Sequence, residues 1–196
     1  MTDYYIPFTK EMKKTHTILV PNMLPTHFKL VIQVLRSYGY KMELLETSGP
    51  EITEKGLRYV HNDTCYPAIL VIGQFIEAIE SGRYDPDKVA LILFQTGGGC
   101  RASNYISLLR KALKKSGHEN VPVISFSLSS IEKHPGFSLT PAMLYKMLYG
   151  AVYGDLIANL KNQCKPYEKF NGDTDALCEL YTEKTVRHMQ EDRLFF

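Results

Sequence analysis

The feature that most constrains the fold is the run of six apolar residues Val89–Phe94, which leads directly into Gln-Thr-Gly-Gly-Gly at residues 95–99. A continuous apolar run is typical of a strand covered on both faces, as in a parallel α/β sheet. Beyond the glycines, apolar residues recur at helical spacing until Gly117, which is expected to end that helix. Residues 89–117 therefore predict a strand, a glycine loop and a helix.

The same alternation of strand and helix runs through the rest of the chain. Strands are predicted at residues 17–20, 41–45 and 121–127, because these short stretches are apolar and end at turn residues. Helices are predicted from residue 26 to Gly39, weakly at 52–59, from Cys65 to residue 82, and at 141–160 and 174–189. This order predicts an α/β protein with a Rossmann-like three-layer fold and a mostly parallel sheet.

Length and composition fit one globular domain with flanking segments. The chain has 196 residues, of which 44% are hydrophobic, enough for a full core. We expect an N-terminal extension at residues 1–14 and a Rossmann-like domain at 15–165. The polar residues 166–196 are expected to form a C-terminal helical segment that belongs to a larger unit.

The charge balance and the cysteine spacing exclude several classes of binding partner and of structural site. Lysine and arginine number 23 against 21 acidic residues, so no strong field favours nucleic acid or an anionic membrane. The N-terminus lacks the order of a secretory signal, and no apolar run approaches the roughly 20 residues that span a bilayer. We therefore predict a cytoplasmic protein. Its four cysteines show no Cys-x-x-Cys pair, which argues against a disulfide framework and a structural zinc site.

Two cysteines lie where strands or loops pass into helices. Cys65 occurs in HNDTCYPA at residues 61–68, and Cys100 occurs in QTGGGCRASN at residues 95–104. Ligands of parallel α/β sheets bind at the carboxyl ends of the strands, and a thiolate at a helix amino terminus is stabilised by the positive end of the helix dipole. If the two loops are neighbours, both thiolates face one site.

An iron–sulfur cluster is one group that would suit such a site. It requires thiolate ligands and is stabilised by backbone amides that donate to its sulfurs. Gly97, Gly98 and Gly99 would let the backbone approach a bulky anionic group. The alternative is that Cys65 and Cys100 are small core residues without a ligand.

The glycine loop is open to two other interpretations. It satisfies the loose dinucleotide pattern G-x-G-x-x-[GA], but the next strand ends in Ser-Phe-Ser without the acidic residue that binds a ribose. No Gly-Lys-Ser/Thr follows, so it is not a phosphate-binding P-loop. The glycines would otherwise serve only a tight strand-to-helix turn.

Other polar and sulfur-containing residues are weaker candidates. His61 would either be solvated or supply a proton near the site. Three residues after Cys100 are expected to cap the helix rather than bind an anionic substrate: Arg101, Ser103 and Asn104. Cys164 and Cys178 lie on helical stretches and are expected to be incidental or packing residues rather than ligands.

Residues 61–68 and 95–105, together with 20–25 and 122–125, resemble the signature segments of proteins related to the 2-hydroxyacyl-CoA dehydratases and their activases. The likeness is closest to the dehydratase-like portion of large fused activase-related proteins. It extends over roughly residues 15–175.

The resemblance implies Rossmann-like domains and a four-iron–four-sulfur cluster held by cysteines at the strand ends, with Cys65 and Cys100 at the matching positions. In that family an ATP-hydrolysing activator delivers one electron to the cluster. The substrate thioester is then reduced to a ketyl radical and loses its hydroxyl as water. The implied partners are an ATP-dependent activator or fused activase domain and an acyl-CoA substrate.

The chain departs from the family pattern in three respects. It has about half the length of a dehydratase subunit, no assigned third cysteine ligand, and no phosphate motif of the ATPase activator. An ATP-driven step is therefore expected on another chain or domain, and the cluster is expected to be incomplete or absent in this chain alone. We expect a cluster-binding component of a lyase system. The alternative is a regulatory or assembly domain that binds a protein partner without a cluster, and nucleotide binding ranks third.

Overall fold

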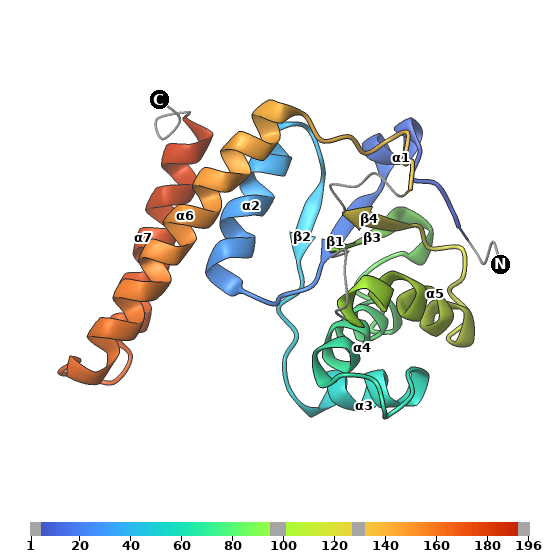
Figure 1. Ribbon diagram of the computed structural model, residues 1–196, viewed down its shortest axis with the longest axis horizontal. Coiled ribbons are helices and arrows are strands. Elements are labelled where there is room, and N and C mark those ends of the chain that lie inside the picture. The colour runs from blue at the N-terminus through green and yellow to red at the C-terminus, as the bar shows by residue number, and fades with distance from the viewer. Residues whose placement is uncertain (1–4, 95–100, 127–131, 192–196) are drawn as a thin grey trace. The chain divides into compact units, whose positions relative to one another are not determined.

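The computed structural model describes residues 5–94, 101–126 and 132–191. The chain forms two compact units, one of residues 1–22 and 41–138 and the other of residues 23–40 and 139–196. The first unit holds the sheet, and the second holds three long helices (Figure 1). The boundaries predicted after residues 14 and 165 remain predictions.

The sheet has four parallel strands. They are β1 (Thr17–Val20), β2 (Met42–Leu44), β3 (Val89–Phe94) and β4 (Val123–Phe126), in the spatial order β2-β1-β3-β4. Ile18 of β1 aligns with Met42 on one side and with Ala90 on the other, while Ile92 of β3 aligns with Ile124. The predicted α/β Rossmann-like fold with a parallel sheet is confirmed.

The helices after β1 lie where the apolar spacing predicted them, while the short helix before β1 was not predicted. The first unit contains α1 (Lys10–Thr15), α3 (Pro50–Tyr59), α4 (Tyr66–Glu80) and α5 (Tyr105–Lys115), with short 3-10 helices η1 (Pro86–Lys88) and η2 (Arg101–Asn104). The second unit contains α2 (Pro25–Ser37), α6 (Pro141–Cys164), α7 (Asp173–Gln190) and the 3-10 helix η3 (Lys165–Tyr167). Gly39 and Gly117 follow α2 and α5 with φ of 81° and 78°, the left-handed conformation that favours glycine at helix ends.

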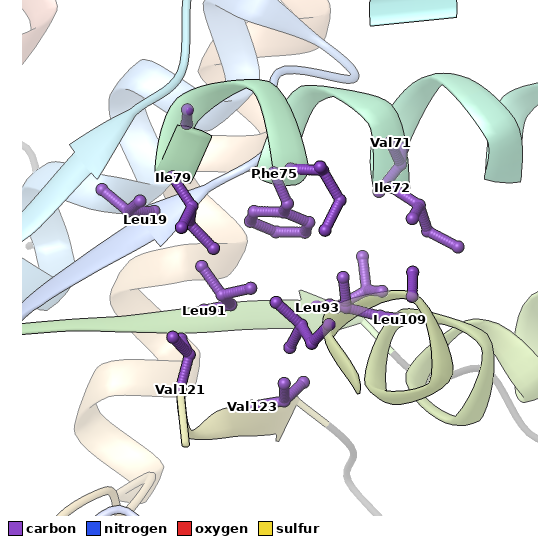
Figure 2. Packing of buried hydrophobic residues seen from close by; sticks show 14 of the residues in the cluster. Leu19, Val71, Ile72, Phe75, Ile79, Leu91, Leu93, Leu109, Val121 and Val123 are labelled. Atoms are coloured by element: carbon purple, nitrogen blue, oxygen red, sulfur yellow. The ribbon is translucent and has the colours of Figure 1, made fainter. Parts of the chain in front are cut away.

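The core of the first unit lies between α4, α5 and one face of the sheet. Leu91 and Leu93 of β3 project from this face, and Phe75 and Ile79 of α4 pack over them (Figure 2). Leu109 of α5 completes the cluster, and all five side chains are at most 3% exposed. Because neighbouring strand residues point to opposite faces, the buried Ile92 belongs to the other face, which explains the uninterrupted apolar run.

Two glycines bring α3 against α4 at backbone contact. A Cβ on Gly73 of α4 would lie 1.8 Å from the Ile52 carbonyl oxygen, and a Cβ on Gly56 of α3 would lie 2.2 Å from the Ile69 carbonyl oxygen. No side chain fits at either position. The absence of a Cβ, rather than positive φ, is what these two positions require.

The second unit packs α2, α6 and α7 through small residues and polar pairs. Gly154 of α6 lies beneath the His27 ring, and His27 Nε2 is 2.9 Å from Asp155 Oδ1. Lys165 Nζ is 2.7 Å from Asp175 Oδ2, which ties the end of α6 to the start of α7. None of the helices in the described ranges is both long enough and apolar enough to cross a bilayer.

Gly73→Ala is expected to lower the free energy of unfolding by about 3 kcal/mol, because the new methyl group collides with the Ile52 carbonyl oxygen and forces α3 and α4 apart. Urea unfolding followed by circular dichroism measures this change. Gly150→Ala is the matched control, since the nearest atom to its Cβ would be the flexible Met189 methyl carbon at 3.3 Å. A Gly73→Ala protein as stable as the Gly150→Ala protein would contradict the close contact.

Candidate functional site

Cys65 occupies the N-cap position of α4, as its place in the sequence predicted. Its side chain is half-buried against the core and makes no capping hydrogen bond. The Cys65 Sγ lies 3.0 Å from the Tyr105 Oη, at the first turn of α5. A free thiol at the start of α4 therefore contacts the side chain of the first residue of α5.

Both helix starts lie toward the carboxyl edge of the sheet. The chain runs from the end of α4 through η1 to the beginning of β3, so the start of α4 lies toward the opposite end of that strand. The start of α5 follows β3 after the glycine segment. In parallel α/β sheets this edge is where ligands bind.

Cys100, Gly97, Gly98 and Gly99 lie outside the described residues, so the predicted meeting of two thiolates stays a prediction. After these residues, η2 leads into α5. Asn104 is the N-cap of α5, but its φ of −100° and ψ of 0° are helical, and its side chain makes no capping hydrogen bond. The predicted capping by this side chain is therefore wrong, because a capping residue needs an extended backbone.

The remaining predicted candidates are His61, Cys164 and Cys178. His61 is 75% exposed, and its Nδ1 lies 3.3 Å from Asp63 Oδ2 and accepts a hydrogen bond from the Asp63 backbone. Cys164 is exposed at the end of α6, and Cys178 is half-buried on α7 with its Sγ 4.0 Å from Thr26 Oγ1. Within the described ranges, no group of three or more metal-ligating side chains occurs.

Gln74 organises the loops that follow β1 and β2. This side chain is 4% exposed in the middle of α4. Its Oε1 accepts from the Asn22 backbone N–H at 2.8 Å, and its Nε2 donates to the carbonyl oxygens of Thr47 at 2.7 Å and Leu45 at 3.4 Å. One amide thus satisfies three backbone groups beyond the ends of two neighbouring strands. A glutamine within the apolar run of residues 68–76 was the sequence signal for it.

A second polar cluster joins residues 132 and 134 to α5 and to the N-terminal segment. Arg110 of α5 donates through both terminal nitrogens to the Glu132 carboxylate, each at 2.7 Å. The buried His134 places its Nε2 3.5 Å from Glu132 Oε2 and accepts at Nδ1 from the Phe8 backbone at 3.2 Å. Sequence reasoning missed this cluster, because its members are far apart in the chain and follow no motif.

The Glu132 carboxyl is strongly biased toward its charged form. Burial raises its pKa, but hydrogen bonds from His134 and Arg110, together with the guanidinium charge, outweigh burial and hold the pKa at about 2. The carboxylate is therefore ionised at all but very acidic pH. Its role is to anchor the chain around the sheet edge rather than to exchange a proton near neutrality.

The structure thus shows one half-buried thiol with a tyrosine hydroxyl against it and, separately, two polar clusters built on α4 and α5. Comparison of the chain with protein-family models, curated proteins and solved structures found no match.

Gln74→Ala is expected to lower the free energy of unfolding by about 3 kcal/mol, because it leaves the Asn22 N–H and the Thr47 carbonyl without their buried partner. Gln74→Met should cost a similar amount, since it keeps most of the volume but not the hydrogen bonds. Urea unfolding provides the measurement. Gln163→Ala, at an exposed glutamine of α6, should change stability by less than about 0.5 kcal/mol. A stable Gln74→Met protein would show that only volume matters.

Glu132 is expected to contribute to stability in a pH-dependent manner. Its folded pKa of about 2 lies below the ordinary 4.5, so its contribution is present above about pH 5 and is lost as pH falls toward 2. Glu132→Gln should be about 1–2 kcal/mol less stable at pH 6, with the gap closing near pH 2. Unfolding measured between these pH values tests this. Glu119→Gln, at an exposed carboxylate, is the control, and a gap for Glu132→Gln that is independent of pH would refute the expectation.

Proposed function

We propose that this chain is an iron–sulfur-cluster-binding domain related to the 2-hydroxyacyl-CoA dehydratases. Cys65 and Cys100 would supply thiolate ligands, and a further ligand would come from another domain or chain. The observation that carries the proposal is the half-buried Cys65 thiol at the start of α4, in contact with Tyr105 at the start of the helix that follows the Gly97–Gly99 segment.

The donor chemistry at Cys65 fits such a group. Iron–sulfur clusters are ligated by cysteine sulfur. Cys65 is not engaged in a disulfide, and its side chain is neither fully buried nor fully exposed. Among the described residues it is the only cysteine at the start of an α-helix, since Cys164 ends α6 and precedes the 3-10 helix η3, and Cys178 lies within α7.

Tyr105 has a positioning role in this proposal. Its hydroxyl can donate to the Cys65 sulfur, and its ring is only 8% exposed, so it limits access of water to that side of the thiol. A cluster, when bound, supplies one-electron acceptance and donation. Hydrogen bonds to ligand sulfurs stabilise the more negative reduced state, so Tyr105 would raise the reduction potential.

The activator and the substrate complete the proposal by analogy with the family. An ATP-dependent activator or a fused activase domain would deliver the electron, and an acyl-CoA would be dehydrated. Cys65 and Tyr105 then hold the redox group. Gln74 binds the backbone after β1 and β2, and Glu132 binds Arg110 of α5.

A second candidate function is a partner-binding regulatory or assembly domain without a cluster. The observation in its favour is the apolar surface of α6. Five of its side chains are about half exposed or more and recur at steps of three or four residues: Tyr145, Leu148, Val152, Leu156 and Leu160. Such a stripe is typical of a helix face that packs against another protein surface.

Anaerobic reconstitution of the full chain with iron and sulfide, in excess 2-mercaptoethanol to replace the ligand expected from another domain or chain, tests the first candidate. We expect charge-transfer absorption near about 400 nm, lost in Cys65→Ser and in Cys100→Ser but kept in the control Cys164→Ser. Tyr105→Phe should retain the absorption and lower the reduction potential by an amount on the order of tens of millivolts.

The alternative predicts a different outcome from the same samples. If the parent protein and Cys65→Ser both stay free of iron while the chain still co-purifies with an activator, the cluster proposal fails and the partner-binding role is favoured. If iron binds equally to Cys65→Ser and the parent, the assignment of Cys65 as a ligand is wrong.

A further inference from the structure

A cavity of about 350 Å³ lies between α5 and the segment that leaves α3. Its floor is apolar and is formed by Tyr59, Val60 and Leu108, and His61 lies at its edge. Cavities of this size with an apolar floor are typical of small-molecule sites. Neither Cys65 nor Tyr105 lines it, so it is separate from the thiol.

Three lysines of α5 form the rest of the cavity wall: Lys111, Lys114 and Lys115. Residues 108, 111 and 115 are three and four positions apart and thus share one helix face. Lys115 Nζ also donates to the Tyr59 carbonyl oxygen at 3.3 Å, which holds its charge at the cavity. No aspartate or glutamate in the described part of the chain lines this space.

The helix dipole alone does not account for this arrangement. Cations in the last turn of a helix are favoured there, which accounts for Lys114 and Lys115 on any face of α5. It does not account for Lys111 one turn earlier, for their convergence on one cavity, or for the apolar floor. By contrast Arg110, on the same helix, is directed to Glu132. Lys111 and Lys115 are four positions apart on α5, and like charges at this spacing repel one another, so a bound anion would relieve that repulsion.

We infer that this cavity binds a small anionic molecule with an apolar or aromatic body, whose phosphate or carboxylate group contacts the lysines. The apolar body would lie against Tyr59 and Leu108. Hydrophobic burial would supply affinity, and the lysines would select for negative charge. This site does not depend on the proposed cluster.

The test uses the full chain, free of metal, at pH 8 and low ionic strength. Three probes separate the chemistry: 2-naphthyl phosphate, 2-naphthoate and inorganic phosphate. Binding is followed by amide chemical-shift changes in proton–nitrogen NMR spectra. We expect saturable binding of at least one naphthyl anion, about ten-fold or more tighter than inorganic phosphate, with shifts in residues 59–61 and 108–115. The tighter of the two naphthyl anions identifies phosphate or carboxylate as the preferred group.

Two charge-reversal variants provide the decisive comparison. Lys111→Glu should weaken binding about ten-fold or more, whereas Lys10→Glu, an equal charge change on exposed α1, should weaken it less than about two-fold. Thermal unfolding confirms that both variants fold, and Leu108→Ala offers a second, uncharged disruption of the floor. The inference is overturned if no naphthyl anion saturates, if the shifts map elsewhere, or if both charge variants weaken binding equally.

Discussion

The burial of α4 is the constraint on which the sheet unit depends. Ten of its fifteen residues are buried, on all sides of the helix rather than along one stripe. Phe75 and Ile79 pack on the strands, while Gly73 touches the backbone of α3. A helix enclosed in this manner has little freedom to rotate or slide, because interiors are close-packed and any shift opens voids or creates collisions.

α4 also orders the chain at the carboxyl edge of the sheet. Gln74 uses the helix as a support from which one amide orders the loops after β1 and β2. Cys65 starts the same helix, so its thiol is placed by the same packing and meets Tyr105 of α5. Arg110 of α5 binds Glu132.

Different faces of α5 contact three different parts of the molecule, because side chains three to four residues apart share a helix face and others do not. Leu109 and Leu113 face the core, Arg110 turns toward Glu132, and Lys111 faces the cavity beside Tyr59. The helix therefore links the thiol at its first residue to the basic cavity along its later turns. The two proposed sites are distinct in chemistry, since one offers sulfur and the other offers cationic nitrogen above an apolar floor.

The sequence by itself determined the alternation of strands and helices, because period and glycine position are local properties. Val89–Phe94 and Thr17–Val20 are strands as predicted, and Cys65 does begin a helix. Only the tertiary structure decided that Cys65 meets Tyr105, that Arg110 reaches Glu132, and that three lysines share a cavity with Tyr59. Those contacts join residues 22 to 56 positions apart, and their partners depend on how whole elements pack, which no local pattern encodes.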